Sequence, residues 1–217
     1  MLVLPLLTAL VAGFTHALEP DHMAAVTTFV SRRPGPVKAL GFGVRWGVGH
    51  SIALIAVGGV LILLDLQVPE TIAIGLEFGV GAMLAGLGVW VLGGALHRSA
   101  FEQAHHAAHE NTLPHSHHHP HGHSTLWVGM AHGLAGTAAF LTLIPLTLLS
   151  SPWMAAGYLL SFGIGTVVAM GMYALAAGYI FHQVGDKVPQ LGRMMQIGTG
   201  IATLVLGLFW MYGAAIG

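Results

Sequence analysis

Long apolar segments separated by short polar ones dominate this chain of 217 residues. A helix needs about 20 apolar residues to cross a hydrocarbon core that is about 30 Å thick. Six segments meet this length, and their approximate limits are 2–28, 37–64, 70–96, 125–150, 152–181 and 191–216. The pattern therefore predicts an all-α integral membrane protein with six transmembrane helices.

Composition supports a protein whose main partner is the lipid bilayer. Charged residues make up 7% of the chain, whereas soluble proteins contain about 25%. The 31 glycines suit helices that approach one another closely in lipid. The net charge of -1 gives no indication of nucleic-acid binding, and the absence of cysteine excludes disulfides and thiolate ligands.

An internal repeat relates the two ends of the chain. The segment GFTHAL at 13–18 matches GMAHGL at 129–134, and WGVG at 46–49 matches FGIG at 162–165, both at an offset of 116 residues. A chance likeness between glycine-rich spans is the alternative explanation. Since each half holds three spans, duplication predicts two inverted repeats, an arrangement that is common in transporters.

This repeat gives the predicted domain organisation. Residues 1–97 form the first three-helix repeat, 98–124 a histidine-rich connection, and 125–217 the second repeat. Positive charge favours the cytoplasmic side of a membrane. All seven basic residues lie in or beside the first, third and fifth connections, at Arg32, Arg33, Lys38, Arg45, Arg98, Lys187 and Arg193. The histidine-rich connection is therefore predicted to be cytoplasmic, with both termini outside.

A break is expected in the first span, at the sequence HALEPDH from His16 to His22. Pro20 lacks an N–H group, and its ring clashes with the carbonyl four residues earlier, so a regular helix should kink or open here. In a straight helix His16 and His22 would point about 120° apart. A break lets their side chains converge.

Placing an ionisable side chain in a transmembrane segment costs free energy, so such residues usually have a functional role. His16, Asp21 and His22, joined by His50 of the second span, form a candidate site for Ni(II), Co(II), Zn(II) or Cu(II). A histidine that is simply hydrogen-bonded in the core is the alternative for any one of them. Candidates for a second coordination layer or an ion pathway are Glu19, Glu77 and His132. His132 is expected to contribute less, because Thr137 and Ala138 stand where a second Asp-His pair would repeat.

The connection at 98–124 is predicted to be a disordered metal buffer or sensor, with a solvated linker as the alternative. Proline and glycine interrupt its histidines, so the segment cannot form a packed core. The candidate ligands are His105, His106, His109, His115, His117, His118, His119, His121 and His123.

The His16-x4-Asp21-His22 motif, Gly49-His50-Ser51 and the segment GLAGTA at 133–138 resemble the nickel/cobalt transporter family, which includes nickel-efflux and urease-accessory membrane relatives. The resemblance implies a non-enzymatic carrier of Ni(II) or Co(II) in the bacterial inner membrane, with no organic cofactor. It also implies that His16, Asp21 and His22 are essential for metal selection. A cytoplasmic metallochaperone is a candidate partner. The uptake branch usually has Asp-Ala where this chain has Glu19-Pro20, so efflux is an alternative to uptake.

A membrane-embedded zinc hydrolase is the alternative from another functional class. The same ligands would hold Zn(II) with one open position that activates water. The carrier is favoured because the second half offers no acid, base or nucleophile opposite the metal ligands, and because inverted duplication is typical of carriers.

Overall fold

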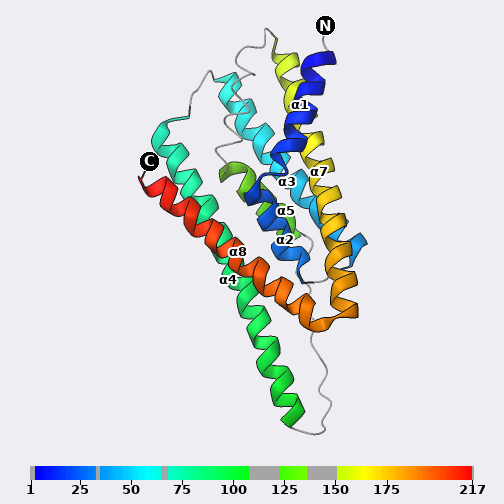
Figure 1. The fold of residues 1–217 in the computed structure, drawn as a ribbon. Helices are drawn as coiled ribbons and strands as arrows, with labels where there is room; N and C mark the ends of the chain where they lie inside the picture. Colours follow the sequence, from blue (N-terminus) through cyan, green and yellow to red (C-terminus); the bar gives the residue numbers. More distant parts are fainter. Residues whose placement is uncertain (1–2, 33–34, 65–67, 108–122, 136–150, 217) are drawn as a thin grey trace.

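The protein is all-α wherever the computed structural model describes it, at residues 3–32, 35–64, 68–107, 123–135 and 151–216 (Figure 1). No strand occurs in these ranges, which confirms the predicted helical class. The helices are α1 (Val3–His16), α2 (Pro20–Val30), α3 (Pro36–Leu63), α4 (Glu70–Ala107), α5 (His123–Ala135), α7 (Pro152–Lys187) and α8 (Pro189–Ile216).

Four of these helices, α3, α4, α7 and α8, are long and apolar enough to cross a bilayer. The pair α1 and α2 gives a fifth candidate span, bent by 57° at the break between them. The six predicted spans thus correspond to four or five in the described chain. Of the predicted span 125–150, α5 covers the part up to Ala135, and 136–150 lie outside the described residues.

The helix contacts divide the molecule into two groups (Figure 1). In one group α3 packs against α5 and α7, and α1 packs against α7. The other group is the pair α4 and α8, which pack against each other before the last part of α4 extends away from the other helices. Helix α2 touches α4, α7 and α8, so it lies between the two groups.

Two glycine contacts in the first group are related by the offset of 116 residues. A methyl group added at Gly13 of α1 would overlap the carbonyl oxygen of Phe162 in α7. A methyl group added at Gly129 of α5 would overlap the carbonyl oxygen of Trp46 in α3. Gly129 is the counterpart of Gly13, and Phe162 is the counterpart of Trp46, so the α1–α7 and α5–α3 contacts use matching residues.

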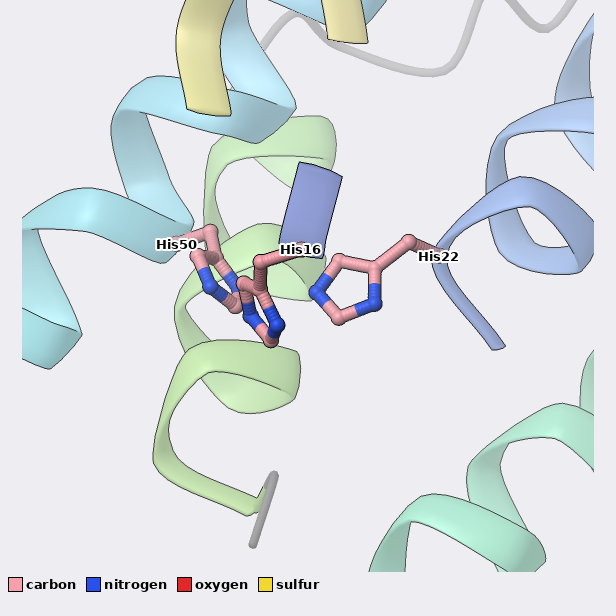
Figure 2. A group of neighbouring side chains, drawn as sticks. All are labelled: His16, His22 and His50. Carbon is pink, nitrogen blue, oxygen red and sulfur yellow. The ribbon is translucent and has the colours of Figure 1, made fainter. Parts of the chain in front are cut away.

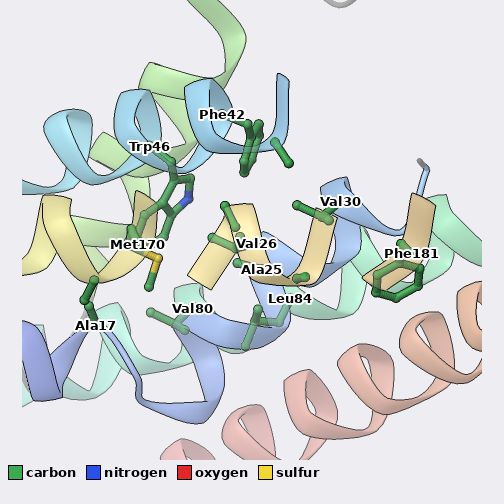
Figure 3. Packing of buried hydrophobic residues seen from close by; sticks show 14 residues of the cluster. Ala17, Ala25, Val26, Val30, Phe42, Trp46, Val80, Leu84, Met170 and Phe181 are labelled. Atoms are coloured by element: carbon green, nitrogen blue, oxygen red, sulfur yellow. The ribbon is translucent and has the colours of Figure 1, made fainter. Parts of the chain in front are cut away.

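The main apolar core surrounds α2 (Figure 3). Val26 of α2, Trp46 of α3, Leu84 of α4 and Met170 of α7 are all fully buried in it. Large apolar side chains such as Phe209 of α8 are exposed on the outside, as expected for a surface that faces lipid. The core therefore holds α2, and with it the predicted ligands Asp21 and His22, against three longer helices.

Helix α4 continues ten residues beyond the predicted end of the first repeat, from residue 97 to Ala107. The predicted connection 98–124 is therefore helical in its first part. Good helix formers such as Ala, Glu and Gln occupy this stretch, and no glycine or proline occurs between Gly94 and Pro114. Hydropathy predicts that a span ends where polar residues begin. The helix itself continues through these polar residues to Ala107.

Candidate metal centre

The candidate centre is built at the break between α1 and α2. Helix α1 ends at His16 and α2 begins at Pro20, whose missing N–H is not needed in a first helical turn. Between them the Glu19 N–H donates to the His16 carbonyl at 3.0 Å. The bend brings the His16 and His22 rings to a centroid distance of 4.5 Å, at an edge-to-face angle of 71°.

His50 of α3 completes a group of three imidazoles (Figure 2). Its ring centroid lies 5.4 Å from that of His16 and 5.0 Å from that of His22. One nitrogen from each of the three rings lies within 4.8 Å of the others. All three side chains are buried, so three separate helices contribute to one enclosed cluster.

Most nitrogens of this cluster have no hydrogen-bond partner among the described residues. The buried nitrogens without a hydrogen-bond partner are both nitrogens of His16, both of His50, and Nε2 of His22. Buried polar atoms are normally hydrogen-bonded, and leaving one unpaired costs about 1–3 kcal/mol. A metal ion bound between the three rings would be the partner of one nitrogen from each of them.

Both carboxylate oxygens of Asp21 are hydrogen-bonded to histidines, whereas most nitrogens of the three imidazoles have no such partner. Its Oδ1 lies 2.9 Å from Nδ1 of His22, and its Oδ2 lies 3.0 Å from Nε2 of His132. The carboxylate is buried and belongs to the first turn of α2, where negative charge is favoured. Asp21, predicted as a ligand, thus lies beside the three imidazoles with both of its oxygens already paired.

His132 reaches this centre from α5, in the second half of the chain. Its side chain is completely buried, and its ring centroid lies 4.5 Å from that of His22. His132 was predicted to contribute less to metal binding because its half lacks a second Asp-His pair. Folding brings it to the Asp21 of the first half instead, so the centre contains residues from both halves.

Two aromatic side chains that were not predicted as site residues line the cluster. Trp46 stacks on His50 with ring centroids 5.4 Å apart, and it meets the ring of His132 edge-on at 5.1 Å. Phe162 lies 5.4 Å from the His16 ring. The signal was present, because Trp46 and Phe162 are the matched aromatic positions of the internal repeat.

The two predicted secondary carboxylates lie in different surroundings. Glu19 Oε1 is 3.1 Å from His16 Nδ1, without the alignment of a hydrogen bond, and is partly exposed. Glu77 is partly buried on α4, outside both groups of metal-binding type in the described residues. The position of Glu19 suits an outer partner of His16, whereas Glu77 does not join the centre.

The predicted histidines of the connection are not brought to this centre by the described structure. His105 and His106 belong to α4 and His123 begins α5, as far as the course of the backbone is described. The other six lie outside the described residues: His109, His115, His117, His118, His119 and His121.

The ligand chemistry of the centre favours borderline divalent ions. Imidazole nitrogen suits Ni, Co, Zn and Cu, whereas Mg and Ca prefer sites made of oxygen. Three imidazoles form an incomplete coordination shell, which leaves one or more positions for water or for an incoming ligand. Such a site can bind an ion tightly and still exchange it.

Comparison with known proteins identifies relatives for most of the chain. Residues 47–209 match the family described as cytochrome c biogenesis protein transmembrane region. The urease accessory protein UreH of Bacillus sp. (strain TB-90) is 30% identical over 212 residues, which cover 95% of this chain and 90% of that protein. This relative confirms the resemblance to the transporter group with urease-accessory members. No solved structure matches the chain.

Two plant proteins are more distant relatives. Chloroplast protein FOR GROWTH AND FERTILITY 2 of Arabidopsis thaliana is 28% identical over 93% of this chain and 54% of its own length. Chloroplast protein FOR GROWTH AND FERTILITY 1 of the same plant is 26% identical over 93% of this chain and 57% of its own length. The chain thus spans little more than half of these two proteins.

Proposed function

The chain belongs to the family of the cytochrome c biogenesis protein transmembrane region, and we propose that it carries divalent transition-metal ions across the membrane. The observation that carries this proposal is the enclosed group of three imidazoles, whose buried nitrogens lack other partners. Its likeness to a urease accessory protein supports a role in metal supply. Ni(II) and Co(II), implied by the sequence resemblance, are the proposed substrates.

We further propose that two inverted repeats, 1–97 and 125–217, surround this centre. The matched glycine contacts of α1 with α7 and of α5 with α3 support the duplication. In such carriers the ion binds near the middle of the membrane at an interrupted helix, and one repeat rocks against the other. The break between α1 and α2, beside the imidazoles, suits this mechanism.

The proposed location is the bacterial inner membrane, with both termini outside and segment 98–124 in the cytoplasm. The positive-inside rule supports this orientation, because the basic residues gather beside the first, third and fifth connections. Since α4 extends to Ala107, this segment would begin as a helix that projects from the membrane.

Transport by the purified protein tests the proposal directly. We expect liposomes that contain the protein to take up or release Ni(II) and Co(II) faster than protein-free liposomes, as followed by a metal-sensitive dye inside the vesicles. Mg(II), which prefers oxygen ligands, serves as the control ion. Loading metal inside or outside determines the direction. Flux no greater than in protein-free liposomes would exclude a carrier.

The histidine-rich segment should affect capacity rather than transport. Replacing residues 108–122 by a Gly/Ser linker of equal length leaves α4, α5 and the three imidazoles unchanged. We expect transport to persist and equilibrium dialysis to show fewer bound ions, with the tightest site retained. If flux is lost in a protein that is still folded and inserted in the membrane, the segment belongs to the ion path.

A zinc-dependent hydrolase remains the second candidate, since three imidazoles with an open position also describe catalytic zinc sites. Hydrolysis needs an acid or base beside the metal-bound water. Asp21 is engaged by two histidines, and Glu77 lies outside both metal-binding groups of the described residues, so neither is in position. Hydrolytic activity without ion flux would favour this alternative.

A further inference from the structure

His22, Asp21 and His132 form a hydrogen-bonded chain that links the two halves of the protein. Asp21 lies between the histidines, with one oxygen facing each of them. An ionised carboxylate can only accept hydrogen bonds, so each facing ring nitrogen must be the donor. Both hydrogen bonds therefore converge on Asp21: Nδ1–H of His22 donates to Oδ1, and Nε2–H of His132 donates to Oδ2.

This arrangement decides which nitrogen of His22 can bind a metal ion. When the Nδ1 of a neutral imidazole carries the proton, its lone pair lies on Nε2. In His22, Nε2 is the buried nitrogen without a partner, and its ring reaches toward His16 and His50 (Figure 2). Asp21 thus selects the form of His22 that presents a free lone pair to the other two imidazoles.

His132 in turn holds Asp21. Without it, Oδ2 of a buried carboxylate would lose its partner and the carboxylate would be free to rotate away from His22. The ring of His132 lies 6.1 Å from that of His50, the longest separation among the ring contacts of the cluster. No group of metal-binding type in the described chain joins His132 with His16 or His50.

We propose that the ion is held by His16, His22 and His50, whereas Asp21 and His132 are positioning residues that orient His22. The inference rests on the proposed metal binding and deepens it in one respect. Ligands come from the first half, but their alignment depends on a residue of the second half. Movement of α5 relative to α2 would break the Asp21–His132 bond and loosen the ion, which gives a carrier a means of release.

The test compares His132→Ala with His132→Gln. Glutamine can place a donor near the position of Nε2 and so preserve the bond to Asp21, whereas alanine cannot. Both changes are made in a full-length protein in which the nine histidines of 98–124 are replaced by glutamine, to remove competing sites. His182→Ala, at a partly exposed histidine of α7 paired with Asp186, is the control.

Cobalt(II) absorption and X-ray absorption spectroscopy then report the coordinating atoms. We expect three imidazoles in the parent protein, in both His132 variants and in the control. His132→Ala should lower Co(II) affinity by about 10- to 100-fold, as loss of an outer partner does, and His132→Gln should restore most of it. Asp21→Asn should also keep three imidazoles and weaken binding.

A double variant tests whether His132 acts through Asp21. If it does, Asp21→Asn combined with His132→Ala should bind Co(II) no more weakly than Asp21→Asn alone, because the effects of coupled residues do not add.

Different results would overturn different proposals. A fourth imidazole that is lost in His132→Ala, an oxygen ligand that is lost in Asp21→Asn, or equal affinity of the two His132 variants would each refute the positioning role. A parent protein without an imidazole-bound ion would refute the metal centre itself. Intact coordination without flux in liposomes would refute transport and leave the positioning role standing.

Discussion

Replacing His16, His22 or His50 by alanine is expected to abolish high-affinity metal binding. Each change removes one of the three proposed ligands, and three imidazoles alone would already leave the coordination shell of the ion incomplete. Loss of an outer partner typically lowers metal affinity by 10- to 100-fold, so loss of a ligand should lower it by more than about 100-fold. Calorimetric titration of the detergent-solubilised variants with Ni(II) and Co(II) measures the effect.

The control for these variants is again His182→Ala, which removes an imidazole from α7 away from the cluster. The protein with glutamine at the nine histidines of 98–124 is the suitable background. A single variant, such as His50→Ala, that retains the affinity of this background would show that its histidine is not a ligand. Asp21, His22 and His132 would then be the remaining candidate group in the described part of the chain.

The proximity of His16 and His22 could be predicted from the sequence, because its determinants are local. Two histidines six residues apart with a proline between them suggest a helix break that brings their rings together, and the rings of His16 and His22 do lie in contact. His50 followed from the cost of an ionisable group in an apolar span. Its distance from the other two rings was not predictable, since it depends on how α3 packs.

The contribution of His132 could not be judged within its own half. The positions that correspond to Asp21 and His22 are Thr137 and Ala138, which do not repeat the Asp-His pair. His132 was therefore predicted to contribute less than the histidines of the first half. Its partner Asp21 is 111 residues away in the chain, and the contact exists only because α5 and α2 meet in the folded protein. The internal repeat marks Trp46 as matching Phe162, but its contacts with the rings of His50 and His132 depend on how the helices pack.

The limits of the helices show a second kind of difference. Hydropathy located the apolar spans α3, α4, α7 and α8 close to their observed positions. It ended the third span at residue 96, although α4 continues to Ala107 through polar residues of good helix propensity. The length of the apolar segment indicates how much of a helix lies in lipid. The end of the helix depends on the helix propensity of the residues that follow and on glycine or proline.

Gly13→Ala and Gly129→Ala are expected to destabilise the fold strongly and to similar extents. Each added methyl group would overlap a backbone carbonyl oxygen, that of Phe162 or of Trp46, which cannot rotate aside as a side chain can. Overpacking of this kind costs about 1–3 kcal/mol or more. Thermal unfolding in detergent, followed by intrinsic fluorescence, should show a clearly lower midpoint for both variants.

The controls are Gly86→Ala on α4 and Gly198→Ala on α8, where a methyl group would meet no atom within 4 Å. These changes should be neutral or slightly stabilising, since alanine favours a helix by about 1 kcal/mol over glycine. Metal affinity should fall with stability at Gly13 and Gly129, because Phe162 contacts the His16 ring and Trp46 stacks on His50. A large effect at only one of the two glycines would contradict the proposed equivalence of the repeats, since matched positions in a duplicated structure should tolerate the same substitution equally poorly.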